Sequence, residues 1–379
     1  MATGDPLLLP GTVLDRLVRL RWALCLVAAF EALVVRPPAA WDLQQFAAGG
    51  RAVLTGDLAS VYASSWMQAG PFELLAAWLM NPSAGGSMRC LAYGAPDVLV
   101  RAVAGAVVTG AVMVFVRHLR AVHSLEPSAP AEFAAGAASL VLMLPVRWCA
   151  EGHLAQAGVA VAWIWAASLL VRGRSSAAAL VIGLAAGWEP WGVLAAGLLL
   201  TERRFPFLAR AVAVFVTTAV AAYLPFVATG HFELFDLTWP VVRETLWGQL
   251  FPEHVQTGWY ARVLQGLLAG LAGCALARAL GRRAELVWLG PLAVVLARLA
   301  LDPLILAYYW TAVLVLLVVG AGFARDRWPV AAPVLMVAPF VQLSPAFWTW
   351  QNTWYLPAAA CLVMFAVVVA QGRRSEVVV

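Results

Sequence analysis

The sequence predicts an all-α protein that crosses a membrane many times. Of its 379 residues, 63% are hydrophobic and only 12% are charged, whereas soluble domains are about 45–50% apolar and about 25% charged. The mean hydropathy is +0.83. All 25 basic residues are arginines, and most gather in short bunches separated by apolar sequence. We therefore expect an integral cell-membrane protein with one transmembrane domain over residues 1–379.

The arginine bunches predict how the chain is threaded. They lie at 16–21, 117–120, 172–174, 203–210, 278–283, 325–327 and 373–374. Short cytoplasmic loops collect arginine, so we place every bunch and both termini in the cytoplasm. Each interval then holds a hairpin, which gives about ten full transmembrane helices, some of them short. The predicted pairs are 22–36 with 97–116, 131–147 with 154–171, 207–227 with 258–277, 284–300 with 304–322, and 328–344 with 353–371.

The interval from 175 to 202 is too short for two full spans. The sequence Trp188-Glu189-Pro190-Trp191 stands at its middle, and a proline removes a helix donor and breaks the run. We expect two short helices that meet partway to the outer face. Irregular backbone at that depth is tolerated where protein or a cavity covers it, which predicts a cavity near Glu189.

Two outer loops are long, at 37–96 and 228–257. Residues 70–80 of the first are apolar but cover only half a span, as expected of a helix lying in the membrane interface. The second loop mixes aromatic, acidic and histidine side chains. Most of the 18 tryptophans also fall on the outer side. An aromatic belt explains many of them. A belt should be similar on both faces, so the excess of tryptophan on the outer side indicates an aromatic-lined outer cavity.

No motif for a soluble cofactor is present. A Walker A motif, GxGxxG and HExxH are all absent, which argues against ATP-driven pumping and against a nucleotide-sugar site. We expect no cofactor and no nucleic-acid partner and assign no residue to a metal site, and metal dependence stays open. The substrate is expected to come from the lipid.

Four polar clusters fall on the predicted outer face. Asp42 follows the first span, and its simplest role is to cap the next helix or to face water. Arg298 could snorkel, and Asp302-Pro303 could make a turn. Ionisable groups at membrane depth nevertheless indicate a functional site. The candidates are Asp42, Arg147, His153, Glu189, Arg298, Asp302, Tyr308 and Tyr309.

The ordered set of motifs resembles a known family. The segments WDLQQFAAGGRAVLTGDLASVYASSWMQAGPFELL, EGHLAQAGVAVAWIWAASLLVRGR, GLAAGWEPWGVLAAGLLLTERR and RLALDPLILAYYW occur in that order over most of the chain. They are similar to the C-type polytopic glycosyltransferases, and more narrowly to glycosyltransferase family 87 and its actinobacterial relatives. These enzymes take a sugar from a polyprenyl-phosphate carrier and act on the extracytoplasmic side.

The resemblance implies the C-type glycosyltransferase fold and an inverting transfer of a sugar, with mannose expected. It implies that Asp42 is the general base and that Arg298, or else Arg147, stabilises the leaving phosphate. The other residues implied to bind substrate are His153, Tyr308, Tyr309, Glu189, Asp302, Gln68 and Tyr62. The implied partners are a lipid-linked sugar donor, a glycolipid or polysaccharide acceptor, and membrane lipids.

The sequence departs from the family at two places. Relatives often carry an acid shortly after the Gly-His pair, whereas Leu154-Ala155-Gln156 follows here. They also often have lysine where this chain has Trp188-Glu189. Two alternatives therefore stay open: a transporter or flippase of a lipid-linked sugar, for which broken helices with a buried acid are typical, and a catalytically inactive membrane paralogue.

Overall fold

The computed structural model describes residues 13–35, 41–80, 95–126, 128–304 and 306–324, with short pieces at 358–360, 362–364 and 366–367. This part of the chain is helical apart from its loops and one antiparallel pair of two-residue strands, β1 (Trp239–Pro240) and β2 (Gln256–Thr257). The prediction of an all-α membrane protein is confirmed at this level. Predicted span 328–344 and the ends of span 353–371 lie outside the described residues.

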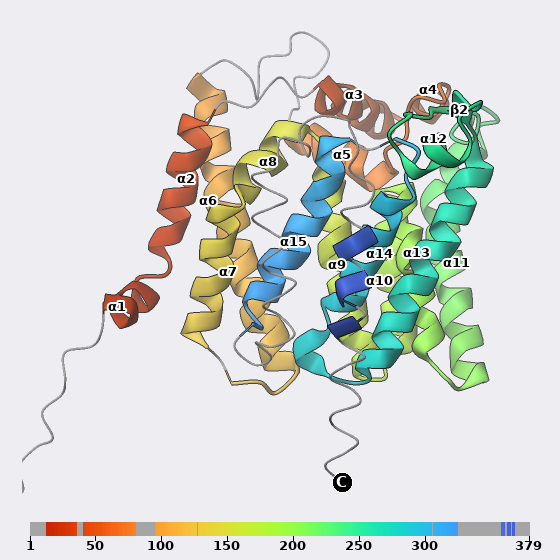
Figure 1. Cartoon of the computed structure of the whole chain (residues 1–379). Coiled ribbons are helices and arrows are strands. Elements are labelled where there is room, and N and C mark those ends of the chain that lie inside the picture. The colour runs from red at the N-terminus through yellow and green to blue at the C-terminus, as the bar shows by residue number, and fades with distance from the viewer. Residues whose placement is uncertain are drawn as a thin grey trace, which may run out of the picture.

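The helices form an upright bundle with a cap of short elements at one end (Figure 1). Four helices within the described ranges are long and apolar enough to cross a membrane, at Arg101–Val122, Leu154–Val171, Phe205–Val227 and Trp259–Leu280. Shorter apolar helices stand among them, so the count of about ten spans stays a prediction. The bundle helices are α2 (Ala23–Val34), α6 (Ala95–Val122), α7 (Ala129–Val141), α8 (Leu144–Glu151), α9 (Leu154–Val171), α10 (Ser175–Trp188), η1 (Pro190–Thr201), α11 (Phe205–Val227), α13 (Trp259–Leu280), α14 (Leu289–Ala300) and α15 (Trp310–Ala321).

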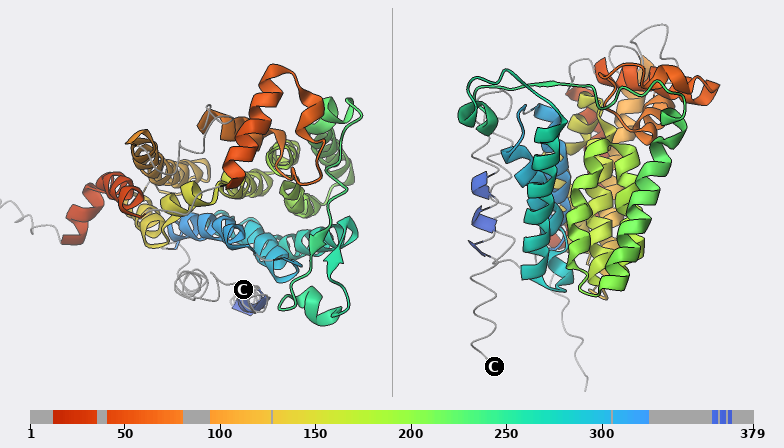
Figure 2. Two further views of the ribbon diagram at one scale, coloured as in Figure 1. Left: turned by 90° about the horizontal axis from the view of Figure 1, so that it is seen from above. Right: turned by 90° about the vertical axis from the view of Figure 1, so that its right-hand side faces the viewer.

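The cap consists of the described parts of the two long loops that the sequence predicts to lie outside. It contains α3 (Trp41–Thr55), α4 (Leu58–Val61), α5 (Pro71–Met80) and α12 (Leu246–Leu250), and Figure 2 shows α3 and α5 lying across the end of the bundle. The remaining short helices are α1 (Val13–Arg19), η2 (Ala284–Leu286) and η3 (Ala307–Tyr309).

The predicted span over 131–147 is not continuous. It is divided into α7 and α8 at Leu142 and Met143, and Met143 has a left-handed backbone with φ 53°. Pro145 explains the break, because its ring would clash with the carbonyl of Val141 in an unbroken helix. The prediction of one helix there was wrong. Predicted span 154–171, in contrast, coincides with α9.

The broken pair is present as predicted, but its second half is not an α-helix. α10 ends at Trp188, Glu189 is extended with φ −150° and ψ 137°, and Pro190 begins η1, a 3₁₀-helix of 12 residues. A 3₁₀-helix rises about 2.0 Å per residue, so η1 spans about 24 Å, farther than an α-helix of the same length. Residues three apart in η1 therefore lie in one straight row.

The helix at 70–80 is more buried than the interfacial pattern predicted. Glu73, Leu74 and Ala77 of α5 are buried. The backbone N–H of Gly70 donates to the Trp188 carbonyl over 3.1 Å, and Trp188 Nε1 donates to Glu73 Oε2 over 2.8 Å. These bonds join the cap to the end of α10, and they hold α3 indirectly because α3 packs on α5.

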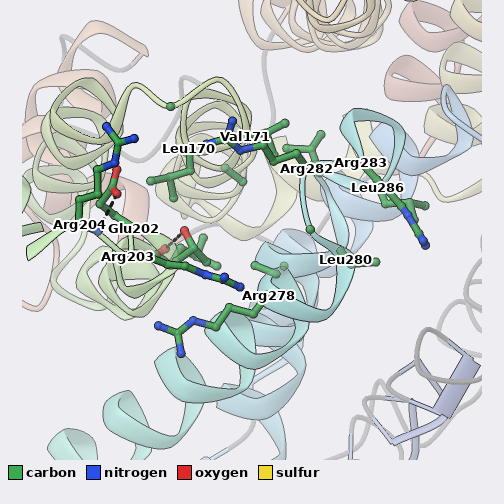
Figure 3. Close-up of a pocket in the computed structure, with 18 residues that line it drawn as sticks. Leu170, Val171, Glu202, Arg203, Arg204, Arg278, Leu280, Arg282, Arg283 and Leu286 are labelled. Atoms are coloured by element: carbon green, nitrogen blue, oxygen red, sulfur yellow. Dashed lines mark hydrogen bonds between the residues drawn. The ribbon is translucent and has the colours of Figure 1, made fainter. Parts of the chain in front are cut away.

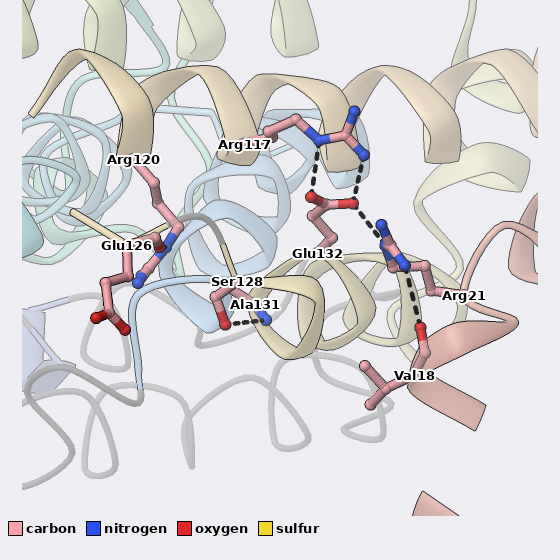
Figure 4. Close-up of polar contacts among 8 residues, drawn as sticks. All are labelled: Val18, Arg21, Arg117, Arg120, Glu126, Ser128, Ala131 and Glu132. Atoms are coloured by element: carbon pink, nitrogen blue, oxygen red, sulfur yellow. Dashed lines mark hydrogen bonds and ion pairs between the residues drawn. The ribbon is translucent and has the colours of Figure 1, made fainter. Parts of the chain in front are cut away.

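At the opposite end, a buried carboxylate joins three helical segments (Figure 4). Glu132 of α7 accepts from Arg117 Nε at 2.7 Å and Nη2 at 2.7 Å, and from Arg21 Nε at 2.6 Å. Ser128 caps the same helix through the backbone N–H of Ala131. The bridge ties the start of α2 to α6 and α7.

Candidate functional site

The cap covers the mouth of a cavity of about 820 Å³ in the bundle. Seven of the predicted site residues line it, and they come from segments far apart in the sequence. They are Asp42, Gln68, His153, Glu189, Arg298, Tyr308 and Tyr309. Three others do not line it, namely Tyr62, Arg147 and Asp302. The predicted cavity near Glu189 is therefore present.

Asp42 lies at the rim of the cavity and contacts a histidine from another helix boundary. Its Oδ2 is 2.7 Å from His153 Nε2, and the Asp42 side chain is 32% exposed whereas that of His153 is 7% exposed. Asp42 is the second residue of α3, in the first turn, where the helix dipole favours negative charge. His153 thus holds the Asp42 carboxylate toward the cavity. An acid that only faced water would need no such partner.

His153 is fixed by aromatic neighbours. It stacks on Tyr308 with ring centroids 3.8 Å apart and a 10° angle between the planes, and Phe46 meets it edge-on at 5.1 Å. Its Nδ1 is buried without a hydrogen-bond partner among the described residues. This packing sets the direction in which Nε2 meets Asp42.

Arg298 lies deeper in the same cavity, between two aromatic rings. Its guanidinium carbon is 4.3 Å from the ring centroid of Trp191 and 4.3 Å from that of Tyr309. The residue is buried, and its Nη1 has no hydrogen-bond partner in the described part of the chain. A buried donor without a partner is costly, so this group is suited to an anionic ligand.

Asp302 supports the arginines and does not face the cavity. It is fully buried, and its Oδ2 accepts from Arg262 Nη1 at 2.9 Å and from Gln265 Nε2 at 3.0 Å. The backbone N–H of Leu304 donates to Oδ1 at 3.0 Å, and Arg298 Nε lies 4.0 Å from Oδ2. The geometry gives Asp302 a positioning role, in place of the predicted direct contact with substrate.

Arg262 and Gln265 are cavity residues that the sequence pattern did not single out. Both are on α13 and line the cavity. The Arg262 guanidinium stacks over Trp239 at 4.6 Å. The available signal was a lone arginine near the outer end of an apolar span, which snorkelling also explains.

The other predicted residues have structural partners. Tyr62 donates to the Ala69 carbonyl at 2.9 Å, and burial, with the charge of Glu189, raises the pKa of Tyr62 well above its usual value. Gln68 Nε2 donates to the carbonyls of Ser65 and Leu234, which fixes the cap over the cavity mouth. Tyr62 is therefore a neutral scaffold residue.

Glu189 and Arg147 differ in their relation to the cavity. Glu189 is buried at the α10–η1 break, and its Oε2 has no hydrogen-bond partner within the described ranges. Arg147 is buried in α8, away from the lining. Of the two arginines that the sequence suggested for the phosphate, Arg298 and not Arg147 thus lines the same cavity as Asp42.

The cavity is polar near the cap and apolar along the bundle. Two of the three rows of η1 line it, namely Pro190, Val193 and Ala196, and Trp191, Leu194, Gly197 and Leu200. Facing residues on α13 include Val263 and Leu271, both exposed. The arrangement suits an amphiphile with an anionic head near Arg298 and an apolar chain along η1.

Together, fold and cavity define a helical membrane protein with an amphiphilic cavity under a cap of short elements. In the described residues, no group of three or more His, Cys, Asp or Glu side chains is placed to hold a metal ion. A scan against models of protein families and a search of curated proteins both found no match for this chain.

Proposed function

We propose that this chain is an inverting glycosyltransferase that moves a sugar, with mannose expected, from a polyprenyl-phosphate carrier to a glycolipid or polysaccharide acceptor. The observation that carries the proposal is the shared cavity. It holds the Asp42 carboxylate at its rim, Arg298 deeper inside with an Nη1 that has no hydrogen-bond partner among the described residues, and an apolar wall that continues along η1. A sugar phosphate on a lipid presents the matching groups in the same order.

The proposed reaction uses Asp42 as general base. The Asp42 carboxylate takes the proton of an acceptor hydroxyl while that oxygen attacks the anomeric carbon. The bond between the anomeric carbon and the phosphate oxygen breaks, and polyprenyl phosphate leaves with the electron pair. Arg298 donates to the phosphate as its negative charge develops. His153 holds Asp42 in place through the 2.7 Å contact.

The proposal also assigns the faces of the membrane. The cap and the cavity mouth are extracytoplasmic, and the arginine-rich end, with both termini, is cytoplasmic. Reporter fusions near Ser124 should report inside, and fusions near His254 should report outside. A fusion near His254 that reports inside would invert the assignment of the active face.

Asp42→Asn tests the chemistry, with Asp57→Asn as the matched control. Asn caps a helix about as well as Asp, but its amide cannot take a proton. In proteoliposomes supplied with labelled polyprenyl-phosphate mannose and a lipid extract as acceptor, we expect transfer to fall by a factor on the order of 10²–10⁴. Asp57 is exposed in the same loop and should tolerate the change.

Each outcome of this experiment separates the hypotheses. Wild-type transfer retained by Asp42→Asn would remove Asp42 as the base. Labelled donor that crosses the bilayer without transfer would favour a flippase. Neither transfer nor crossing by the wild type would favour the inactive paralogue.

A further inference from the structure

A second cavity lies at the other end of α13 from the candidate site. It has a volume of about 390 Å³ and is lined by the ends of α9, η1 and α13 and by the start of α14 (Figure 3). Val171 is the last residue of α9 and Leu280 the last of α13, so the cavity opens where the apolar helices end. In the predicted orientation this is the boundary between the inner leaflet and the cytoplasm.

The cavity gathers arginines from two separate turns. Arg203 and Arg204 follow η1, whereas the others come from the end of α13 and the turn after it, at Arg278, Arg282 and Arg283. Within the described part of the chain, Glu202 is the one acid that lines the cavity. Its Oε1 accepts from the backbone N–H of Arg204 at 3.0 Å.

Apart from Thr201, the remaining lining is apolar, and it belongs to the same hollow as the arginines. It includes Leu170, Val171, Leu198 and Leu286. The hollow therefore combines strong positive charge with a surface that an apolar chain can contact. A tendency of cytoplasmic loops to hold arginine explains each bunch, but it does not require two bunches to converge on one hollow beside apolar side chains.

We propose that this cavity binds the phosphate headgroup of an anionic lipid of the inner leaflet. Guanidinium groups match phosphate oxygens in bidentate pairs, and basic pockets between membrane helices on the cytoplasmic side are suited to anionic headgroups. Leu170 and Val171, which are partly exposed, contact the glycerol and the first methylenes of the chains. This site is separate from the outer cavity and does not depend on the proposed transfer reaction.

The test compares two charge-matched double variants in a neutral detergent, where no anionic surface is present. Arg203→Gln/Arg282→Gln removes two exposed arginines from the cavity, and Arg16→Gln/Arg19→Gln removes two exposed arginines from α1. Bound dioleoylphosphatidylglycerol is counted by native mass spectrometry. Phosphatidylcholine with the same chains and inorganic phosphate serve as comparison ligands.

We expect phosphatidylglycerol to bind the wild type more tightly than phosphatidylcholine does. The cavity double variant should weaken that binding about thirtyfold, since each basic residue near an anionic headgroup contributes about 1 kcal/mol and 1.4 kcal/mol is tenfold. The α1 pair should change it less than about twofold on the same scale. Equal losses for the two pairs would overturn the proposal, and so would inorganic phosphate competing as well as the lipid.

Discussion

Asp302→Asn is the substitution that tests how the two cavity arginines are held. Asp302 is fully buried and is the carboxylate that Arg262 and Arg298 share, at 2.9 and 4.0 Å. Asparagine keeps the size and shape of the side chain, so no space is opened. The change removes one negative charge and replaces one oxygen with an N–H₂ group, which cannot accept a hydrogen bond.

The magnitude follows from the bonds that Oδ2 makes. Oδ2 accepts from Arg262 and from Gln265, and both bonds are lost if the amide nitrogen takes its place. A hydrogen bond to a charged group contributes about 1.5–3 kcal/mol, so two contribute about 3–6 kcal/mol. Breaking a buried ion pair on one side costs about 3–5 kcal/mol. The Arg262 side chain is only 12% exposed, so water replaces the lost carboxylate only in part.

Thermal unfolding of the detergent-purified protein measures the effect. We expect Asp302→Asn to lower the melting temperature by several degrees and Asp57→Asn, at an exposed position, to leave it unchanged. Adding Arg262→Met to Asp302→Asn should recover part of the loss, because it removes one of the two uncompensated charges. If Asp302→Asn and the control Asp57→Asn have the same melting temperature, the two arginines do not depend on this carboxylate and the reasoning fails.

The sequence predicted helices best where a single physical rule decides them. Span 154–171 coincides with α9 because its apolar length and the arginines after it define both ends. The break at Glu189 follows from Pro190 alone. The 3₁₀ form of η1 has no comparable local signal, since most of its residues apart from Gly192 and Gly197 also suit an ordinary apolar helix. Packing against the neighbouring helices decides between a 3₁₀-helix and an α-helix here, and the sequence pattern of η1 does not reveal that packing.

The candidate site was predicted in part, for a similar reason. Asp42, His153, Glu189 and Arg298 were grouped because charged residues at membrane depth gather at shared cavities, and the structure brings these four together. The pattern could not distinguish a residue that lines the cavity from one that supports it. Asp302 belongs to the second kind, since its bonds depend on how α13 packs against α14.

Two further substitutions test the scaffold at opposite ends of the bundle. Glu132→Gln should lower stability by on the order of 2 kcal/mol, because the amide cannot pair with both arginines that Glu132 contacts; thermal unfolding checks this, and an equal loss for the exposed Glu126→Gln would contradict it. Gly50→Ala should reduce transfer, because its Cβ would lie 2.1 Å from the Leu74 carbonyl oxygen. Since α3 would have to move away from α5, the carboxylate at the start of α3 would leave its place over the cavity. Gly258→Ala, whose Cβ would meet no atom closer than 3.8 Å, is the control; if the two variants transfer sugar equally well, contact between α3 and α5 does not set the position of the proposed base.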